Sequence, residues 1–197
     1  MVRSFVTKKM GIFSKQWNER CNKEWGRLAH QAGLSFRKAS FLRWPKMEGE
    51  YRGHEVSISY GGFREYGVPF TTIRLNLPKP AEFSLAVYWY KAYSMRSIPL
   101  SMKKSLSVKE MRLTRVENPE FDELFKVKES DEAITLRIVD PPLQKKILSL
   151  KKPSLFFMLI QKNKISLEAP DAFLGNTKQL KSSVDILVDI AEKAQEI

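Results

Sequence analysis

Three stretches of this chain are predicted to be β-strands, and the first two alternate apolar and polar side chains with the period of a half-buried strand. They cover residues 54–60, 70–78 and 82–93. Arg52-Gly53 precedes the first stretch, Gly61-Gly62 ends it, and Pro78 ends the second because proline donates no ladder hydrogen bond. Strands that come in runs, without helices between them, are typical of an α+β fold. We therefore expect a largely antiparallel sheet of roughly seven to nine strands.

The third stretch is apolar on both of its faces. Phe83, Leu85, Val87 and Trp89 fall on one face, and the other carries Ala86, Tyr88 and Tyr90. We expect both faces of this strand to be covered.

Helical spacing of apolar residues marks both ends of the chain. Residues 14–35 carry an apolar stripe made of Trp17, Cys21, Trp25, Leu28, Ala29 and Ala32. Gly33 is a natural stop for this N-terminal helix, since glycine adopts a positive φ at little cost. A second stripe covers residues 180–191, and Asp171 or Asn176 is the expected start of this C-terminal helix.

The middle of the chain, residues 118–150, combines turn, capping and hydrophobic signals. Residues 121–127 fit either an extended segment or one helical turn followed by such a segment. Ser130 is the expected N-cap of a helix whose inward side chains are Ala133, Ile134, Leu136 and Ile138. Asp140 and Pro141 then restart the helix, because a proline at the first helical position loses no hydrogen bond. We expect a kinked middle helix, followed by a hairpin with its turn at residues 162–164.

The same signals suggest how the chain is divided. We interpret residues 1–13 as a basic N-terminal tail or edge segment and residues 14–35 as the N-terminal helix. Residues 36–197 are expected to form a single α+β domain, with a β-meander half over 36–117 and an αββα-like half over 118–197.

Several common chemistries have no support in the sequence. The single cysteine, Cys21, excludes an intramolecular disulfide and fits a reducing compartment, so we expect a cytoplasmic protein. His30 and His54 are too few, even with Cys21, for a zinc site. Glycine-rich phosphate loops and nucleophile elbows are missing, and no run approaches the roughly 20 apolar residues of a membrane span. We predict no catalytic residues, no metal, no cofactor and no transmembrane segment.

The net charge of +12 is concentrated in two segments. Residues 1–46 hold 11 Lys and Arg against 2 Glu, and residues 91–115 hold 7 against 1. Such segregation favours an acidic macromolecular partner, although a solvated surface that keeps the protein soluble explains it equally well. The predicted anion-binding residues are Arg96, Lys103, Lys104, Lys109, Arg112 and Arg115, and Tyr90 and Tyr93 are the candidate stacking residues.

Short elements in the second half are similar to a known group of sequences. A Phe-Asp-x-x-Phe-x-Val element begins at Phe121, an acidic helix start lies at Asp131, and an amphipathic helix covers residues 180–190. Residues 49–53 form a Gly-x-Tyr-x-Gly element. In these features the chain resembles a group of uncharacterised bacterial and archaeal proteins, some associated with membranes. The resemblance implies one α+β domain over residues 36–197 and implies no activity.

Four hypotheses about function remain open at this point. The leading one is a non-catalytic interaction module that binds an acidic partner through a basic surface. The alternatives are a nucleic-acid-binding protein, a peripheral protein on an anionic membrane surface, and an enzyme without a recognisable motif.

Overall fold

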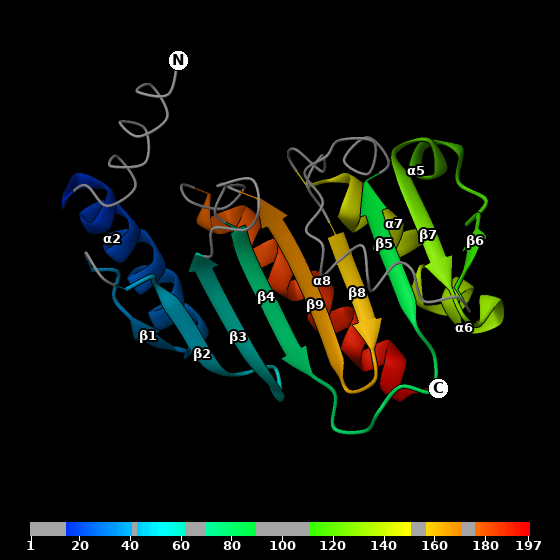
Figure 1. The fold of residues 1–197 in the computed structure, drawn as a ribbon, viewed down its shortest axis with the longest axis horizontal. Helices are drawn as coiled ribbons and strands as arrows, with labels where there is room; N and C mark the ends of the chain where they lie inside the picture. The colour runs from blue at the N-terminus through cyan, green and yellow to red at the C-terminus, as the bar shows by residue number, and fades with distance from the viewer. Residues whose placement is uncertain (1–14, 41–42, 62–69, 90–110, 151–156, 171–175) are drawn as a thin grey trace, which may run out of the picture.

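The computed structural model describes residues 15–40, 43–61, 70–89, 111–150, 157–170 and 176–197 (Figure 1). They form one nine-stranded sheet and five helices, which confirms the predicted α+β class. The strands are β1 (Ser35–Arg37), β2 (Lys46–Tyr51), β3 (His54–Gly61), β4 (Phe70–Asn76), β5 (Leu85–Trp89), β6 (Arg112–Thr114), β7 (Phe125–Glu129), β8 (Phe157–Gln161) and β9 (Lys164–Pro170). The helices are α2 (Lys15–Ala32), α5 (Pro119–Leu124), α6 (Glu132–Ile138), α7 (Pro141–Leu148) and α8 (Thr177–Gln195).

All neighbouring strands are antiparallel, in the order β1-β2-β3-β4-β9-β8-β5-β7-β6. Strands β1 to β4 follow one another in sequence, as a meander does. Along the chain, β5 is the next described strand after β4. In the sheet, the β8–β9 hairpin lies between them. Strands from the two ends of the chain therefore make up the centre of one sheet.

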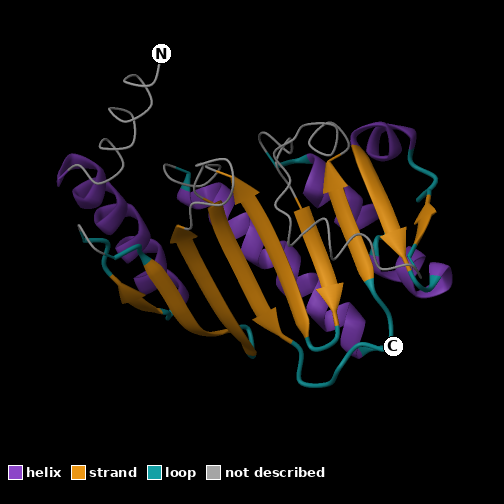
Figure 2. Cartoon of the chain, viewed as in Figure 1, coloured by secondary structure: helices purple, strands orange, loops and turns teal. Residues whose placement is uncertain are grey.

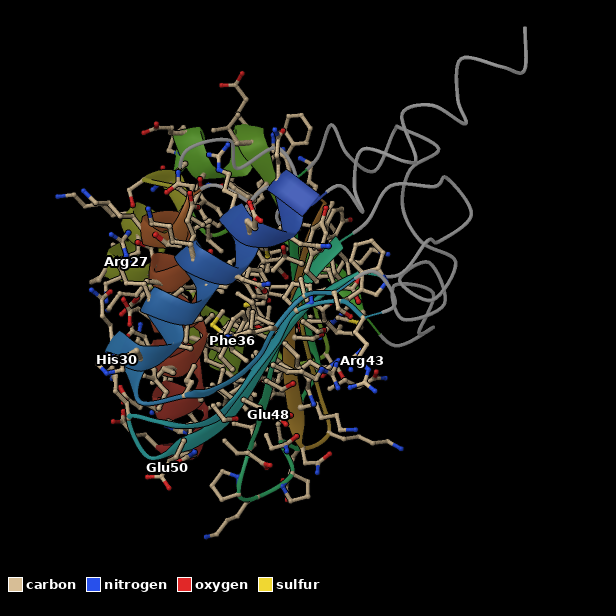
Figure 3. All side chains as sticks on the ribbon, turned by 90° about the vertical axis from the view of Figure 1, so that its left-hand side faces the viewer. Arg27, His30, Phe36, Arg43, Glu48 and Glu50 are labelled. Carbon is tan, nitrogen blue, oxygen red and sulfur yellow. The ribbon has the colours of Figure 1, made fainter. Side chains whose placement is uncertain are left out.

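The described helices cover one face of the sheet (Figures 1 and 2). Figure 3, viewed from the β1 edge, shows Arg27 and His30 on the outer surface of α2, with Arg43 on the opposite side of the molecule. We call the covered side the helix face and the opposite side the second face. One apolar core lies between the sheet and the helices, and it includes Trp25, Met47, Ile58, Ile73, Leu85, Ile165 and Leu187.

Helix α2 buries the predicted stripe from Cys21 to Ala29, while the Trp17 side chain lies outside what the structure describes. Cys21, Trp25, Leu28 and Ala29 are all buried against the sheet. Gly33 has φ +70°, and the Leu34 N–H donates to the Ala29 carbonyl at 2.8 Å. This is the expected glycine stop, in which a left-handed residue turns the last amides back onto the helix.

Residues 118–150 form three helices and a strand. Of the two alternatives for residues 121–127, the structure shows a helical turn followed by an extended segment. Helix α5 contains Phe121, and β7 begins at Phe125. The predicted break is confirmed, because α6 ends at Ile138 and Asp140 caps α7 by accepting from the Leu143 N–H at 3.0 Å.

Two details of this region differ from the prediction. The N-cap of α6 is Asp131, which accepts from the Ile134 N–H at 3.0 Å, and Ser130 instead accepts from the Ser84 N–H. Of the predicted inward side chains, Ile138 is buried and Ile134 is partly buried against the core, whereas Leu136 is 41% exposed and Ala133 is exposed. Thr135, which was not predicted to face inward, is buried. Thr135 and Ile138 are three residues apart and so lie on one side of this short helix, which turns Leu136 outward.

The C-terminal hairpin and the last helix form where the sequence predicts them. Gln161 and Lys164 pair across the Lys162-Asn163 turn, and Asn176 caps α8 by accepting from the Gln179 N–H. Helix α8 packs across β4 and β9 at the centre of the sheet. It buries Leu180, Val184, Ile186, Leu187, Val188, Ile190 and Ala191.

Candidate functional site: the basic edge of the sheet

Only part of the predicted anion-binding surface lies in the described residues. Arg112 belongs to β6 and Arg115 follows it, and both are exposed. The remaining predicted residues lie outside the described residues: Arg96, Lys103, Lys104, Lys109, Tyr90 and Tyr93.

Strand β6, which contains Arg112, is short. It has three residues and pairs with β7 at the end of the sheet. Leu113 is 60% exposed, whereas Met111 and Val116 on either side are buried. The edge strand therefore presents one large apolar side chain to solvent.

Arg112 is held at this edge by a buried acid. Its Nε lies 3.8 Å from Oε1 of Glu129, whose side chain is only 1% exposed. The Thr114 hydroxyl donates to the same Oε1 at 3.0 Å. The Arg112 side chain is 75% exposed, so its guanidinium is available to solvent. Glu129 orients the side chain through the ion pair with Nε.

Two lysines of β7 extend the charge onto the second face. Lys126 pairs with Tyr88 and Lys128 with Ala86 across the β5–β7 register. Ala86 and Tyr88 are buried there with Met111 and Phe157, so the prediction that both faces of β5 are covered is confirmed for these residues. No described helix lies on this face (Figure 2). We call Arg112, Arg115, Lys126 and Lys128 the basic edge.

Lys126 and Lys128 were not among the residues predicted from the sequence, although the strand pattern marks them. The run Phe-Lys-Val-Lys-Glu has a two-residue period, so a strand with Phe125 and Val127 inward places both lysines on the opposite face. Acids are also close by, because α5 contributes Glu120, Asp122 and Glu123 at one end of the strand. The basic character therefore belongs to the strands and not to the adjoining helix.

A second cluster of charged residues lies where the β2–β3 turn meets α7 and α8. It lines a pocket of about 540 Å³. The Tyr51 hydroxyl donates to Asp185 Oδ1 at 2.8 Å and accepts from Lys181 Nζ at 3.1 Å. Arg52 donates to Asp189 at 3.1 Å and to Glu192 at 2.9 Å.

The charges in this second cluster compensate one another. Lys146 Nζ donates to Asp189 Oδ2 at 2.5 Å, and Lys181 Nζ donates to Asp185 Oδ2 at 2.9 Å. The hydrogen bond to Asp185, followed by the one to Tyr51, raises the pKa of Lys181 above its usual value. Since each cation here already has a carboxylate partner, the arrangement joins the β2–β3 hairpin to α8 and does not form an open anion site.

This cluster was also not predicted. Its sequence signal is the acidic series Asp185, Asp189 and Glu192, whose spacing places all three on one side of the last helix. Its partner, Arg52, was identified only as a turn residue, and its pairing with α8 depends on the tertiary structure.

The described residues show no reactive thiol, no metal site and no membrane-spanning helix. Burial, followed by the nearby charge of Glu24, raises the pKa of Cys21 to about 12, so its thiol stays protonated at neutral pH. Nowhere in the described ranges do three His, Cys, Asp or Glu side chains come together as a metal site would require. Among the same residues, no helix is long and apolar enough to span a membrane.

No family model and no curated protein matches this chain. Among solved structures, the chain is similar to the mycobacterial trehalose monomycolate transport factor A, TtfA, with 12% sequence identity and a TM-score of 0.58. The similarity covers 91% of this chain and 95% of the other. At this identity the comparison shows that the two proteins share a fold.

Proposed function

We propose that this protein is a non-catalytic interaction module that binds an acidic partner protein through the basic edge. The observation that carries the proposal is the placement of Arg112, Lys126 and Lys128 on adjacent strands at one end of the sheet. In these two strands the only acid is Glu129, which is buried. Its charge orients Arg112 and offsets one of the four cations of the basic edge, which stays net positive, whereas the three cations of the second cluster face three carboxylates.

Two further points support the proposal. The charge-rich segment of residues 91–115 includes Arg112 and Arg115, so the basic edge continues the segment in which the sequence concentrates its positive charge. The structural neighbour is named a transport factor, and a binding role is compatible with a fold used by such a factor. The single cysteine fits a reducing compartment, and we assign the protein to the cytoplasm as part of this proposal.

Charge-removing variants test the proposal. The first variant carries Arg112→Gln, Lys126→Gln and Lys128→Gln. The matched control carries Lys145→Gln, Lys162→Gln and Lys178→Gln, which removes the same charge from exposed positions elsewhere. The probe is fluorescein-labelled poly-glutamate, and its fluorescence anisotropy reports binding. We expect at least about tenfold weaker binding in the first variant and no change in the control, since attraction depends on where the charges lie.

The same assay separates the alternatives. A variant with Lys103→Ala, Lys104→Ala, Arg112→Ala and Arg115→Ala tests the surface predicted from the sequence, and we expect it to lose poly-glutamate binding as well. Single-stranded dT20 and vesicles of anionic phosphatidylglycerol are compared with poly-glutamate at increasing salt. Preference for dT20 or for the vesicles, or wild-type binding by the first variant, would overturn the proposal.

A further inference from the structure

The outer side of β6 is a sheet edge. In the part of the chain that the structure describes, no strand lies beyond it. Alternate residues of an antiparallel strand direct their N–H and C=O groups toward one neighbour and then the other. At least one of Arg112, Leu113 and Thr114 therefore directs these groups outward, where another strand can pair with them.

The opposite edge of the sheet is protected in a way that β6 is not. Of the residues of β1, Ser35 and Arg37 are exposed and polar, while Phe36 packs against the core beside α2. Short edge strands with polar side chains are a common defence against unwanted pairing. At β6 the corresponding exposed side chain is Leu113, at 60% exposure.

The strand register determines what an added strand would meet. Arg112 pairs with Glu129, which faces the helix side together with Val127. Leu113 pairs with Lys128 on the second face. Successive residues of an added strand would therefore lie beside Arg112 on one face and beside Leu113 on the other.

The side chains at these two positions differ in what they can bind. The ion pair with Glu129 is made by Arg112 Nε, and the terminal nitrogens of the exposed guanidinium can donate hydrogen bonds to a further carboxylate. Leu113 has apolar surface to bury. The complementary segment has acidic and apolar residues in alternation.

We infer that the acidic partner binds as an extended peptide segment that adds a strand to β6, with an acid beside Arg112 and an apolar residue beside Leu113. The inference rests on the proposed function, because the basic edge supplies the attraction to an acidic segment. Strand addition would contribute backbone hydrogen bonds, and the alternating side chains would contribute selectivity. A second copy of this chain is a poorer occupant, since pairing β6 with β6 would bring two basic edges together.

The test uses the full chain and a labelled peptide that contains Glu-Val-Glu-Val-Glu-Val. Within a strand, the N–H groups of the glutamates point to one side and those of the valines to the other. One derivative is N-methylated at the glutamates and another at the valines. We expect one derivative to bind at least about tenfold more weakly and the other to bind like the parent peptide, because only one set of N–H groups faces β6.

Variants of exposed leucines provide the second arm. Leu113→Ser should weaken binding of the alternating peptide by roughly tenfold and leave binding of poly-glutamate unchanged, since only the alternating peptide buries this side chain. Leu136→Ser is the matched control, because Leu136 is exposed on α6, away from the edge.

The outcomes distinguish the inference from the function on which it rests. Equal binding of both methylated derivatives, with poly-glutamate still bound, would overturn strand addition and leave the proposed function in place. Failure of every acidic peptide to bind would overturn both. Sedimentation that shows dimers disrupted by Leu113→Ser would assign the edge to a second copy of the chain and would also overturn the inference.

Discussion

Cys21 and Arg112 show how burial sets the chemistry of single side chains in this protein. Cys21 lies in the core beside Trp25, where burial disfavours the thiolate. Arg112 is exposed, but the acid that orients it is buried. The sequence correctly identified Cys21 as a packing residue from its place on the apolar stripe, whereas the burial of Glu129 follows only from its strand neighbours.

At the residue scale we predict that Cys21 is nearly inert to thiol reagents in the folded protein. Its pKa of about 12, against an ordinary 9.0, lowers the thiolate fraction at pH 8 by about 1,000-fold. The release of thionitrobenzoate from Ellman's reagent measures the rate in buffer and in concentrated urea. The reaction should be slow in buffer and fast in urea. A fast reaction of the native protein at pH 8 would contradict the assignment of Cys21 to the core.

At the scale of elements, the β2–β3 hairpin is joined to α8 by its turn. Arg52 and Gly53 form a two-residue turn with φ +51° and +77°. Asn-Gly is the usual choice for such a turn, since asparagine and glycine tolerate the left-handed region. For most other residues this conformation costs roughly 1–2 kcal/mol. Arginine at this position is explained by its hydrogen bonds to Asp189 and Glu192.

A double-mutant cycle between Arg52 and Asp189 tests this connection. The variants are Arg52→Asn, Asp189→Asn and the double variant, with the free energy of unfolding measured in urea. We expect a coupling of roughly 0.2–1 kcal/mol, which is typical of partly exposed ion pairs. The coupling should shrink in 1 M NaCl, because salt screens exposed charges. Additive effects at low salt would show that the turn and the helix are energetically independent.

At the scale of the whole molecule, the order of the strands makes the two ends of the chain depend on each other. The β8–β9 hairpin separates β4 from β5, and α8 packs across β4 and β9. Removing the C-terminal elements would leave β4 and β5 as two new unpaired edges, which favours aggregation over folding.

We therefore predict that a fragment comprising residues 1–150 does not fold on its own. Without β8, β9 and α8, the core loses Met158, Ile165 and Leu187 among other buried residues. The fragment should give a poorly dispersed amide NMR spectrum and no cooperative thermal transition, whereas the full chain should show both dispersion and cooperativity. A well-dispersed spectrum of the fragment would show that the first part of the chain is an autonomous unit.

The fold class, most element types and the helix ends could be predicted from local patterns in the amino-acid sequence. The two-residue period marked β3 and β4, Gly33 marked the end of α2, and Asp140 with Pro141 marked the break before α7. These signals are local, since side-chain direction, capping and backbone preference depend on residues only a few positions apart.

The strand order, the burial of Glu129 and the pairing of Arg52 with α8 could not be predicted from the sequence. Each depends on contacts between residues far apart in sequence, and hydrophobic pattern alone does not specify which strand pairs with which. The exposure of Leu113 also depends on the tertiary structure. An apolar residue in an alternating stretch is buried only if another element covers that face, and β6 lies at the edge of the sheet.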